Sequence, residues 1–182
     1  RIINKSSSAE SAKYSYDKGL NGTMFSVSLP GTIINYTYDN RLRRASERTD
    51  VDGAIFQNDY SYDSFDRLII EDHSEGTSVS YAYNNQGLLE SITSIISSVV
   101  YNVIGKPKTI SYGNGQDTTY IYDNEAFRTN RITTGSKQGM VYQYDSAGNV
   151  IIMNNTIIDR VSNLNYDSLN RLIFSRTRVD GE

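Results

Sequence analysis

Eight copies of one short pattern run through the chain, and this repetition constrains its fold more than any other feature. The clearest copies read Tyr-x-Tyr-Asp, as at Tyr142, Tyr144 and Asp145. The second aromatic position recurs at intervals of 18 to 24 residues between residues 16 and 166. A recurring period of this length is typical of repeat architectures, in which each unit packs only against its neighbours.

Looser copies lack the first tyrosine or carry asparagine in place of aspartate. Of the 15 tyrosines in the chain, Tyr112 alone lies outside the pattern. All residues of the motif are predicted to have structural roles. They are Tyr14, Tyr16, Asp17, Tyr36, Tyr38, Asp39, Tyr60, Tyr62, Asp63, Tyr81, Tyr83, Asn84, Tyr101, Asn102, Tyr120, Tyr122, Asp123, Tyr142, Tyr144, Asp145, Gly148, Tyr166 and Asp167.

Each copy of the motif predicts a strand that leads into a tight turn. Side chains two residues apart on a strand share a face, so the two tyrosines lie together and the residue between them points the other way. The aspartate or asparagine that follows can accept a hydrogen bond from the backbone N–H two residues on, which starts a turn. Residues that tolerate positive φ come three places later. These are Asp66, Gly87, Gly105, Gly148 and Asn170.

β-branched and bulky residues after each turn predict a return strand, as at residues 67–70, 150–152 and 171–174. The fold class is therefore all-β, with about eight antiparallel hairpins, at most sixteen strands, in a curved or spiralling sheet. No window has the sustained 3.6-residue period of a helix. Because proline cannot donate to a ladder, Pro107 predicts a late or edge strand in the fifth repeat. The sixth repeat has a longer loop before Asn130.

The repeats divide the chain into two parts. Residues 1–13 are expected to be the remnant of a preceding repeat, and residues 14–182 form the repeat array. The chain begins with Arg1 inside the pattern, without a signal peptide, and we expect it to be a fragment of a larger protein.

Composition excludes several classes of function. A net charge of -3 gives no general reason to bind nucleic acid. No run reaches the ~18 apolar residues of a membrane helix, so this segment is not expected to insert into a membrane. The absence of cysteine excludes disulfides and thiolate metal sites. Hydrophobic residues make up 37% of the chain and tryptophan is absent, which favours thin sheets over a thick core.

Candidate residues for chemistry are few. His73 lies in a polar stretch that predicts an exposed loop, and no Gly-x-Ser-x-Gly elbow accompanies it. Asp50 and Asp52 resemble the start of a calcium loop, but Ser61 stands where an EF-hand needs glutamate, so a hairpin turn is expected. The pair Asp63 and Asp66 is explained by the turn pattern. The sequence therefore predicts no catalytic residue, metal or cofactor, and a protein that is not an enzyme.

These motifs resemble the YD-repeat, or Rhs-repeat, family, over nearly all of residues 14–179. The sixth repeat, with residues 127–132 after Asp123, is similar to a variant in the B and C components of bacterial toxin complexes and in Rhs polymorphic toxins. The resemblance implies a hollow shell of hairpins that encloses a toxin polypeptide, in a secreted or cell-surface bacterial protein. The family's Arg-Tyr-Tyr-Asp-Pro autoprotease signature is absent from this sequence.

Two functions follow as expectations. The first is a structural segment of such a shell, whose partners are the remaining repeats of its parent and the encapsulated toxin polypeptide. The alternative is a cell-adhesion or carbohydrate-binding surface on the same repeats, because tyrosine rings can stack on sugars. A tyrosine row could serve both sheet packing and ligand binding, lining a cavity with rings whose hydroxyls stay in water.

Overall fold

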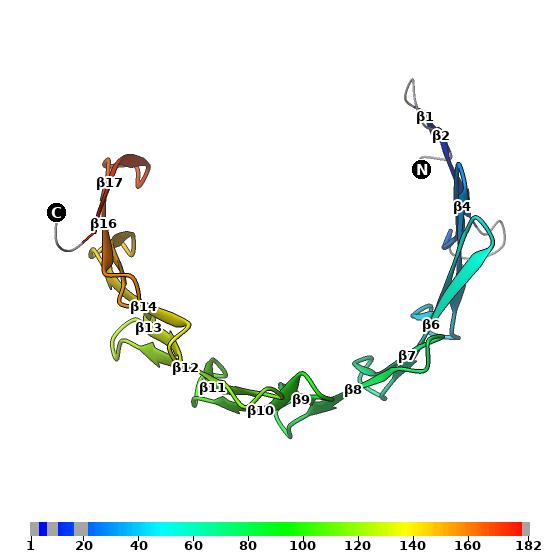
Figure 1. Ribbon diagram of the computed structural model, residues 1–182, viewed down its shortest axis with the longest axis horizontal. Helices are drawn as coiled ribbons and strands as arrows, with labels where there is room; N and C mark the ends of the chain where they lie inside the picture. Colours follow the sequence, from blue (N-terminus) through cyan, green and yellow to red (C-terminus); the bar gives the residue numbers. More distant parts are fainter. Residues whose placement is uncertain (1–3, 7–10, 17–21, 180–182) are drawn as a thin grey trace. The chain divides into compact units, whose positions relative to one another are not determined.

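The computed structural model describes residues 4–6, 11–16 and 22–179, and every regular element within these ranges is a β-strand (Figure 1). All pairings between the strands are antiparallel, which confirms the predicted fold class. The chain divides into two compact units, Arg1–Ala82 and Tyr83–Glu182.

The first unit is a strip in which consecutive strands pair from β1 to β8 (Figure 1). Its strands are β1 (Asn4–Ser6), β2 (Ser11–Tyr16), β3 (Met24–Leu29), β4 (Thr32–Tyr38), β5 (Arg44–Val51), β6 (Ala54–Tyr62), β7 (Leu68–His73) and β8 (Ser78–Tyr83).

The second unit is a strip of the same kind, in which consecutive strands pair from β9 to β17. Its strands are β9 (Leu89–Ile92), β10 (Ile96–Tyr101), β11 (Pro107–Tyr112), β12 (Asp117–Tyr122), β13 (Thr129–Thr134), β14 (Gln138–Tyr144), β15 (Val150–Asn155), β16 (Arg160–Tyr166) and β17 (Leu172–Val179).

Each repeat supplies one Tyr-x-Tyr strand and one return strand. The sixteen strands β2–β17 are therefore the two strands of eight repeats, as predicted, and β1 lies in the segment before them. The boundary between residues 13 and 14 stays a prediction.

A β-bulge marks the same position in one repeat after another. In β4, for example, Thr37 pairs with Ser46 and Tyr38 pairs with Arg44, so the return strand has one extra residue at Ala45. Such a bulge bends the strand and increases its twist. The same register shift precedes the second tyrosine of six further repeats, at residues 16, 62, 101, 122, 144 and 166.

The strips have almost no interior. Among the described residues, the buried side chains are Val27 and Leu164, each 8% exposed, and Thr118, 4% exposed. The Thr118 hydroxyl lies 2.7 Å from that of Thr134 on the neighbouring strand. Stability therefore comes from hydrogen-bonded strand ladders and cross-strand side-chain contacts rather than from a core. The composition predicted such thin sheets.

Two sequence predictions were wrong. Pro107 does not delay the fifth return strand: it is the first residue of β11, which pairs on both sides with β10 and β12. A proline fits at the first position of a strand because its missing N–H leaves the later ladder intact. His73 is not in a loop either, because the ladder continues through it, with Asn58 of β6 opposite.

Candidate functional site

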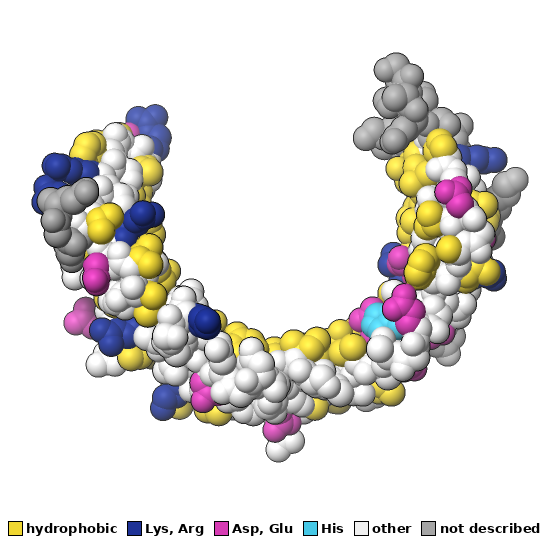
Figure 2. Space-filling view, viewed as in Figure 1, with side chains coloured by type: hydrophobic (Ala, Val, Ile, Leu, Met, Phe, Trp, Pro, Cys, Tyr) yellow, Lys and Arg dark blue, Asp and Glu magenta, His cyan; other side chains and the backbone are white. Residues whose placement is uncertain are grey.

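The tyrosines of the motif form one face of each strip, which we call the tyrosine face. In β14, Tyr142 and Tyr144 are half-buried, whereas Gln143 between them is exposed on the other face. The same alternation holds in β4, β6 and β12. Figure 2 shows hydrophobic side chains, a class in which it includes tyrosine, in a row along one side of β9–β11.

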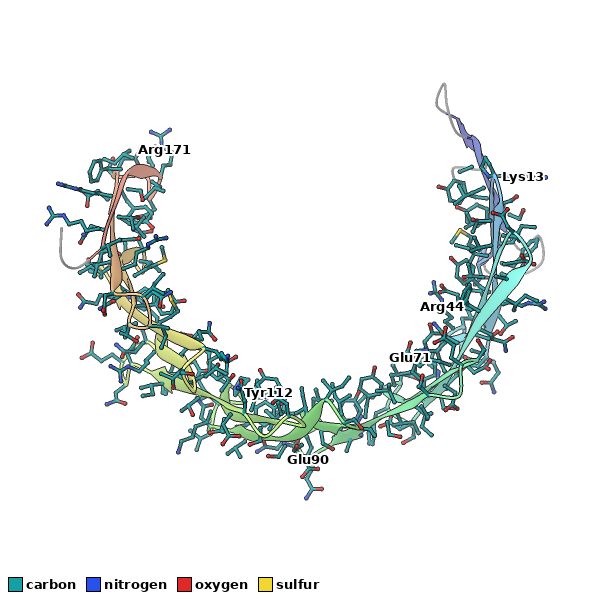
Figure 3. All side chains as sticks on the ribbon, viewed as in Figure 1. Lys13, Arg44, Glu71, Glu90, Tyr112 and Arg171 are labelled. Carbon is teal, nitrogen blue, oxygen red and sulfur yellow. The ribbon has the colours of Figure 1, made fainter. Side chains whose placement is uncertain are left out.

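Tyr112 joins this face although it lies outside the motif. It ends β11, two residues after Ile110, and its hydroxyl is 3.5 Å from the hydroxyl of Thr118. In Figure 3 the side chains of Tyr112 and Glu90 project from opposite faces of the strip. Because side chains alternate along a strand, a tyrosine that lies an even number of residues from another position on the tyrosine face also lies on that face.

Hydroxyls of the second tyrosines tie neighbouring strands together. Tyr144 donates to the carbonyl of Thr129 at 2.7 Å, at the start of the preceding strand. Equivalent bonds run from Tyr38 to Met24, from Tyr62 to Arg44, from Tyr101 to Leu89 and from Tyr122 to Pro107. Sequence reasoning did not foresee these hydroxyl bonds to backbone carbonyls.

Burial is the main cause that raises the pKa of several of these tyrosines, including Tyr62, Tyr101, Tyr122 and Tyr144. A raised pKa keeps the phenol protonated, which is the form that donates the bond.

Each turn is closed by the acidic or amide side chain that begins it. The Asp63 carboxylate accepts from the backbone N–H groups of Phe65 and Arg67 at 2.9 and 3.0 Å. Asn84 accepts in the same way from Gln86 and Leu88. The five residues predicted to have positive φ all have it. Asp17 lies outside the described residues.

In the turns that follow the motif, the sequence prediction missed two residues with positive φ. Leu42 has φ of 64° and Phe127 has φ of 52°. Leu42 occupies the position of Asp66 or Gly87 in its own repeat, so the spacing from Asp39 could have revealed it. Phe127 follows from the longer sixth turn, in which Asp123 accepts from Glu125, Ala126 and Arg128.

The turn carboxylates are held in their ionised form. For Asp39 and Asp63, burial would raise the pKa, but hydrogen bonds from the side chains and backbones of Arg43 and Arg67 outweigh it and lower the pKa. Backbone hydrogen bonds from Ala126 and from Arg171 lower the pKa of Asp123 and of Asp167, respectively. For Asp145 the first cause of its lowered pKa is the side chain of Asn149.

In four repeats the residue after the turn donates to the following turn, and these contacts form what we call the turn-edge ladder. Arg43 donates to the Asp63 carbonyl at 3.1 Å and to the Asp66 carboxylate at 2.7 Å, and its guanidinium lies 4.6 Å from the ring centre of Tyr62. Arg128 donates to the Asp145 carbonyl and lies 5.5 Å from the Tyr144 ring centre.

Lys106 and Asn149 make the corresponding contacts in their repeats. The Lys106 ammonium donates to the Phe127 carbonyl at 2.7 Å and lies 5.4 Å from the ring centre of Tyr122. The Asn149 amide donates to the side-chain oxygen of Asn170 at 2.9 Å. The arginine after a turn thus connects a carboxylate, a tyrosine and the next turn, which sequence reasoning did not foresee.

A polar groove lies in the second unit, beside the longer sixth turn, with a volume of about 770 Å³. It is open to solvent, and its lining combines carboxylates, amides and two tyrosines. The lining residues are Asp123, Asn124, Glu125, Ala126, Arg128, Asn130, Tyr142, Gln143, Tyr144, Asp145 and Ser146.

The candidates for chemistry have structural contacts. His73 Nδ1 is 2.8 Å from Asn58 Oδ1. The Asp50 carboxylate accepts from the Gly53 N–H at 2.9 Å, and Asp52 has φ of 50°, which confirms the predicted hairpin turn.

The described residues contain no group of three or more histidine or acidic residues that could hold a metal ion. They also contain no helix long and apolar enough to cross a membrane.

No protein-family model and no curated protein matches the sequence. The fold matches solved structures. A chain in the crystal structure of TcdB2-TccC3-Cdc42 superposes with a TM-score of 0.68 at 18% sequence identity. The Photorhabdus luminescens Tc holotoxin pore with the mutation TccC3-D651A gives the same values, as does TcdB2-TccC3 without its hypervariable C-terminal region.

Each match covers 91% of this chain and 12% of the other chain, so this chain spans a small part of the structures that it matches. The similarity nevertheless extends over nearly the whole of this chain, and so over both of its units. The chain therefore has the hairpin-repeat fold of the TcdB2-TccC3 toxin complexes, which confirms at the level of the fold its predicted resemblance to the YD-repeat family.

Proposed function

We propose that this chain is a structural segment in the wall of a YD-repeat shell, which encloses a toxin polypeptide in a secreted bacterial toxin complex. The observation that carries the proposal is the hairpin-repeat fold shared with TcdB2-TccC3. A shell wall is a thin, extended structure that does not need a thick core. These strips fit that description, because they have strand ladders, bulges and turn contacts but almost no interior.

The tyrosine face suits contact with a polypeptide cargo. Its rings offer broad apolar area, while threonine and methionine side chains lie between them. The second tyrosines are fixed by their hydroxyl bonds, so the face is rigid. Such a surface can hold many cargo sequences, because it depends on ring contacts rather than on matched charges.

A wall segment of this kind acts without catalysis. His73, the single histidine, is used in a contact with Asn58 beside the β6–β7 ladder. Replacing His73 with alanine in the full-length parent protein is expected to leave cargo release and toxicity unchanged. A loss of either property, with the protein still folded, would contradict this part of the proposal.

Site-specific photo-crosslinking tests which face meets the cargo. A benzophenone amino acid is placed at residue 142 of the full-length parent protein, and the same amino acid at residue 143 is the matched control. The two positions are adjacent in β14 but on opposite faces. We expect cargo crosslinks from residue 142 and none from residue 143. Crosslinks from residue 143 alone would show that the tyrosine face is turned away from the cargo.

A second candidate function is carbohydrate binding at the polar groove of the sixth and seventh repeats. Planar polar side chains beside aromatic rings are suited to sugar hydroxyls and ring faces. The groove offers Asn124, Glu125 and Asn130 beside Tyr142. A glycan array probed with the chain and with its Asn124→Ala/Asn130→Ala variant tests this candidate. Binding that the variant loses would support it, and the absence of binding above background would exclude it.

A further inference from the structure

The turn-edge ladder of the second unit lacks one of its polar contacts. Lys106, Arg128 and Asn149 each donate to the next turn. The residue at the same position in the fourth repeat is Leu88, whose side chain has no group that can donate. Leu88 instead lies beside Gly105: a Cβ added to that glycine would be 3.6 Å from Leu88 Cδ1. The contact between these turns is therefore apolar and small.

Strand pairing is also shortest at this place. β9 has four residues and pairs with β10 at one position, Ile92 opposite Ile96. By comparison, β15, the return strand of the seventh repeat, pairs with the following strand β16 at four positions. Further along, the register of β10 against β11 is also broken between Ile96 and Ser98, in addition to the bulge before Tyr101 that other repeats share.

A tyrosine hydroxyl bond connects β9 and β10 on the tyrosine face. Tyr101 donates to the Leu89 carbonyl at 2.6 Å. The turn itself is closed as in other repeats, because Asn84 accepts from Gln86 and Leu88. The weakness thus lies in the contacts between neighbouring elements, and the turn can stay formed while it separates from the next one.

We propose that residues 84–92, the fourth turn with β9, form an opening point that separates locally from β10 while the rest of the second unit stays folded. Local opening has a low free energy where ladder contacts and packing are few. If the chain is part of a shell wall, this segment is where the wall opens first. That consequence rests on the proposed function, whereas the opening itself does not.

Hydrogen exchange measured by mass spectrometry on residues 1–182 tests the opening. We expect the amides of β9 to exchange at least about tenfold faster than those of β15, after correction for intrinsic rates. Equal protection of the two strands would overturn the proposal.

A variant with a designed turn-edge contact tests whether the missing contact causes the local opening. In the Asn84→Asp/Leu88→Arg variant, the arginine can pair with the new aspartate, donate to the Asn102 carbonyl and stack on Tyr101, as Arg43 does in its own repeat. We expect exchange of β9 to slow by about threefold or more, since cation–π and charge-assisted contacts at exposed sites contribute roughly 0.5 to 1 kcal/mol.

Ser97→Arg is the control for the added arginine, because it introduces a guanidinium at an exposed position of β10. It is expected to leave the exchange of β9 unchanged. Slower exchange in both variants would assign the effect to an added guanidinium at any position, and an unchanged rate in the designed variant would exclude the missing ladder contact as the cause. Either result would contradict the mechanism. Because no cargo is present, a failed crosslinking experiment would leave these outcomes unaffected.

Discussion

The second tyrosine of a repeat combines three roles in one residue. In the seventh repeat the ring of Tyr144 lies on the tyrosine face, its hydroxyl donates to Thr129, and Arg128 lies over its ring. Phenylalanine could supply the ring but not the bond. This explains physically why the position carries tyrosine in all eight copies of the motif.

Removing a single tyrosine hydroxyl separates the contribution of the hydroxyl bond from that of the ring. Tyr144→Phe is expected to lower the free energy of unfolding by about 1 kcal/mol, because the Thr129 carbonyl loses its donor. Tyr142→Phe is the matched control, since the Tyr142 hydroxyl makes no such bond within the described part of the chain, and it should change stability by less than about 0.5 kcal/mol. Urea denaturation of both variants measures the difference. Equal effects would show that the hydroxyl bond has no special importance.

Leu42 stores backbone strain at a turn. Its φ of 64° is unfavourable for a branched side chain, and its side chain is 49% exposed, so little packing compensates. Leu42→Gly is therefore expected to raise stability by about 0.5 to 1 kcal/mol. The opposite change, Gly105→Ala at φ of 78°, should lower it. Thermal unfolding measures the stability of both variants. A Leu42→Gly protein that is less stable than the natural chain would contradict the claim that Leu42 is strained.

At the scale of the element, the repeat is a hairpin whose turn is fixed by one side chain and joined to its neighbour by another. The aspartate or asparagine closes the turn, and the basic residue after it contacts the next turn and the next tyrosine. Neighbouring hairpins are therefore coupled along their turn edge as well as through their strands.

Removing one ladder contact should weaken this coupling. Arg128→Leu, which copies the natural state at Leu88, is expected to lower stability by about 1 kcal/mol through loss of the Asp145 contact and of the Tyr144 stacking. Arg131→Leu, at an exposed position of β13, is the control and should stay within about 0.5 kcal/mol. Chemical denaturation measures both. A larger loss of stability in Arg131→Leu than in Arg128→Leu would indicate that removing a positive charge, and not the ladder contact, causes the effect.

The turn carboxylates predict how stability depends on pH. Folding lowers the pKa of Asp39, Asp63, Asp123, Asp145 and Asp167, so their contribution is complete above the unfolded value of about 3.9. It is lost as the pH falls through the lower folded values. The urea midpoint should therefore stay constant down to about pH 4 and decrease below it.

Asp145→Asn tests this assignment. Asparagine can close the same turn, as Asn84 and Asn102 do, but it does not titrate. Its urea midpoint should decrease less between about pH 4 and about pH 2 than that of the natural chain. Identical profiles would mean that other groups cause the acid sensitivity.

At the scale of the whole molecule, the repeats made the fold predictable, because each local signal occurs many times. The positive φ at Gly148 and the alternation around Gln143 follow from strand and turn geometry alone. The bulge before Tyr144 and the donor to Thr129 do not, because both depend on which strand lies beside which. The position of Pro107 was misjudged because a rule for strand interiors was applied to a strand's first residue.

The candidate site was less predictable than the fold. The polar groove forms where a longer turn meets the next repeat, so its lining comes from residues about twenty positions apart. The opening point at Leu88 likewise depends on contacts with the following turn. Sequence spacing identifies the members of a repeat, but packing between repeats determines what their side chains contact.

Electron microscopy of the full-length parent protein, combined with mass determination, tests the central claim most directly. If this chain is a wall segment, the particle is hollow, its wall is a sheet of hairpins, and density for the cargo polypeptide lies inside. A solid rod, or an open surface with no enclosed density, would contradict the shell and leave adhesion through the same repeats as the function to test.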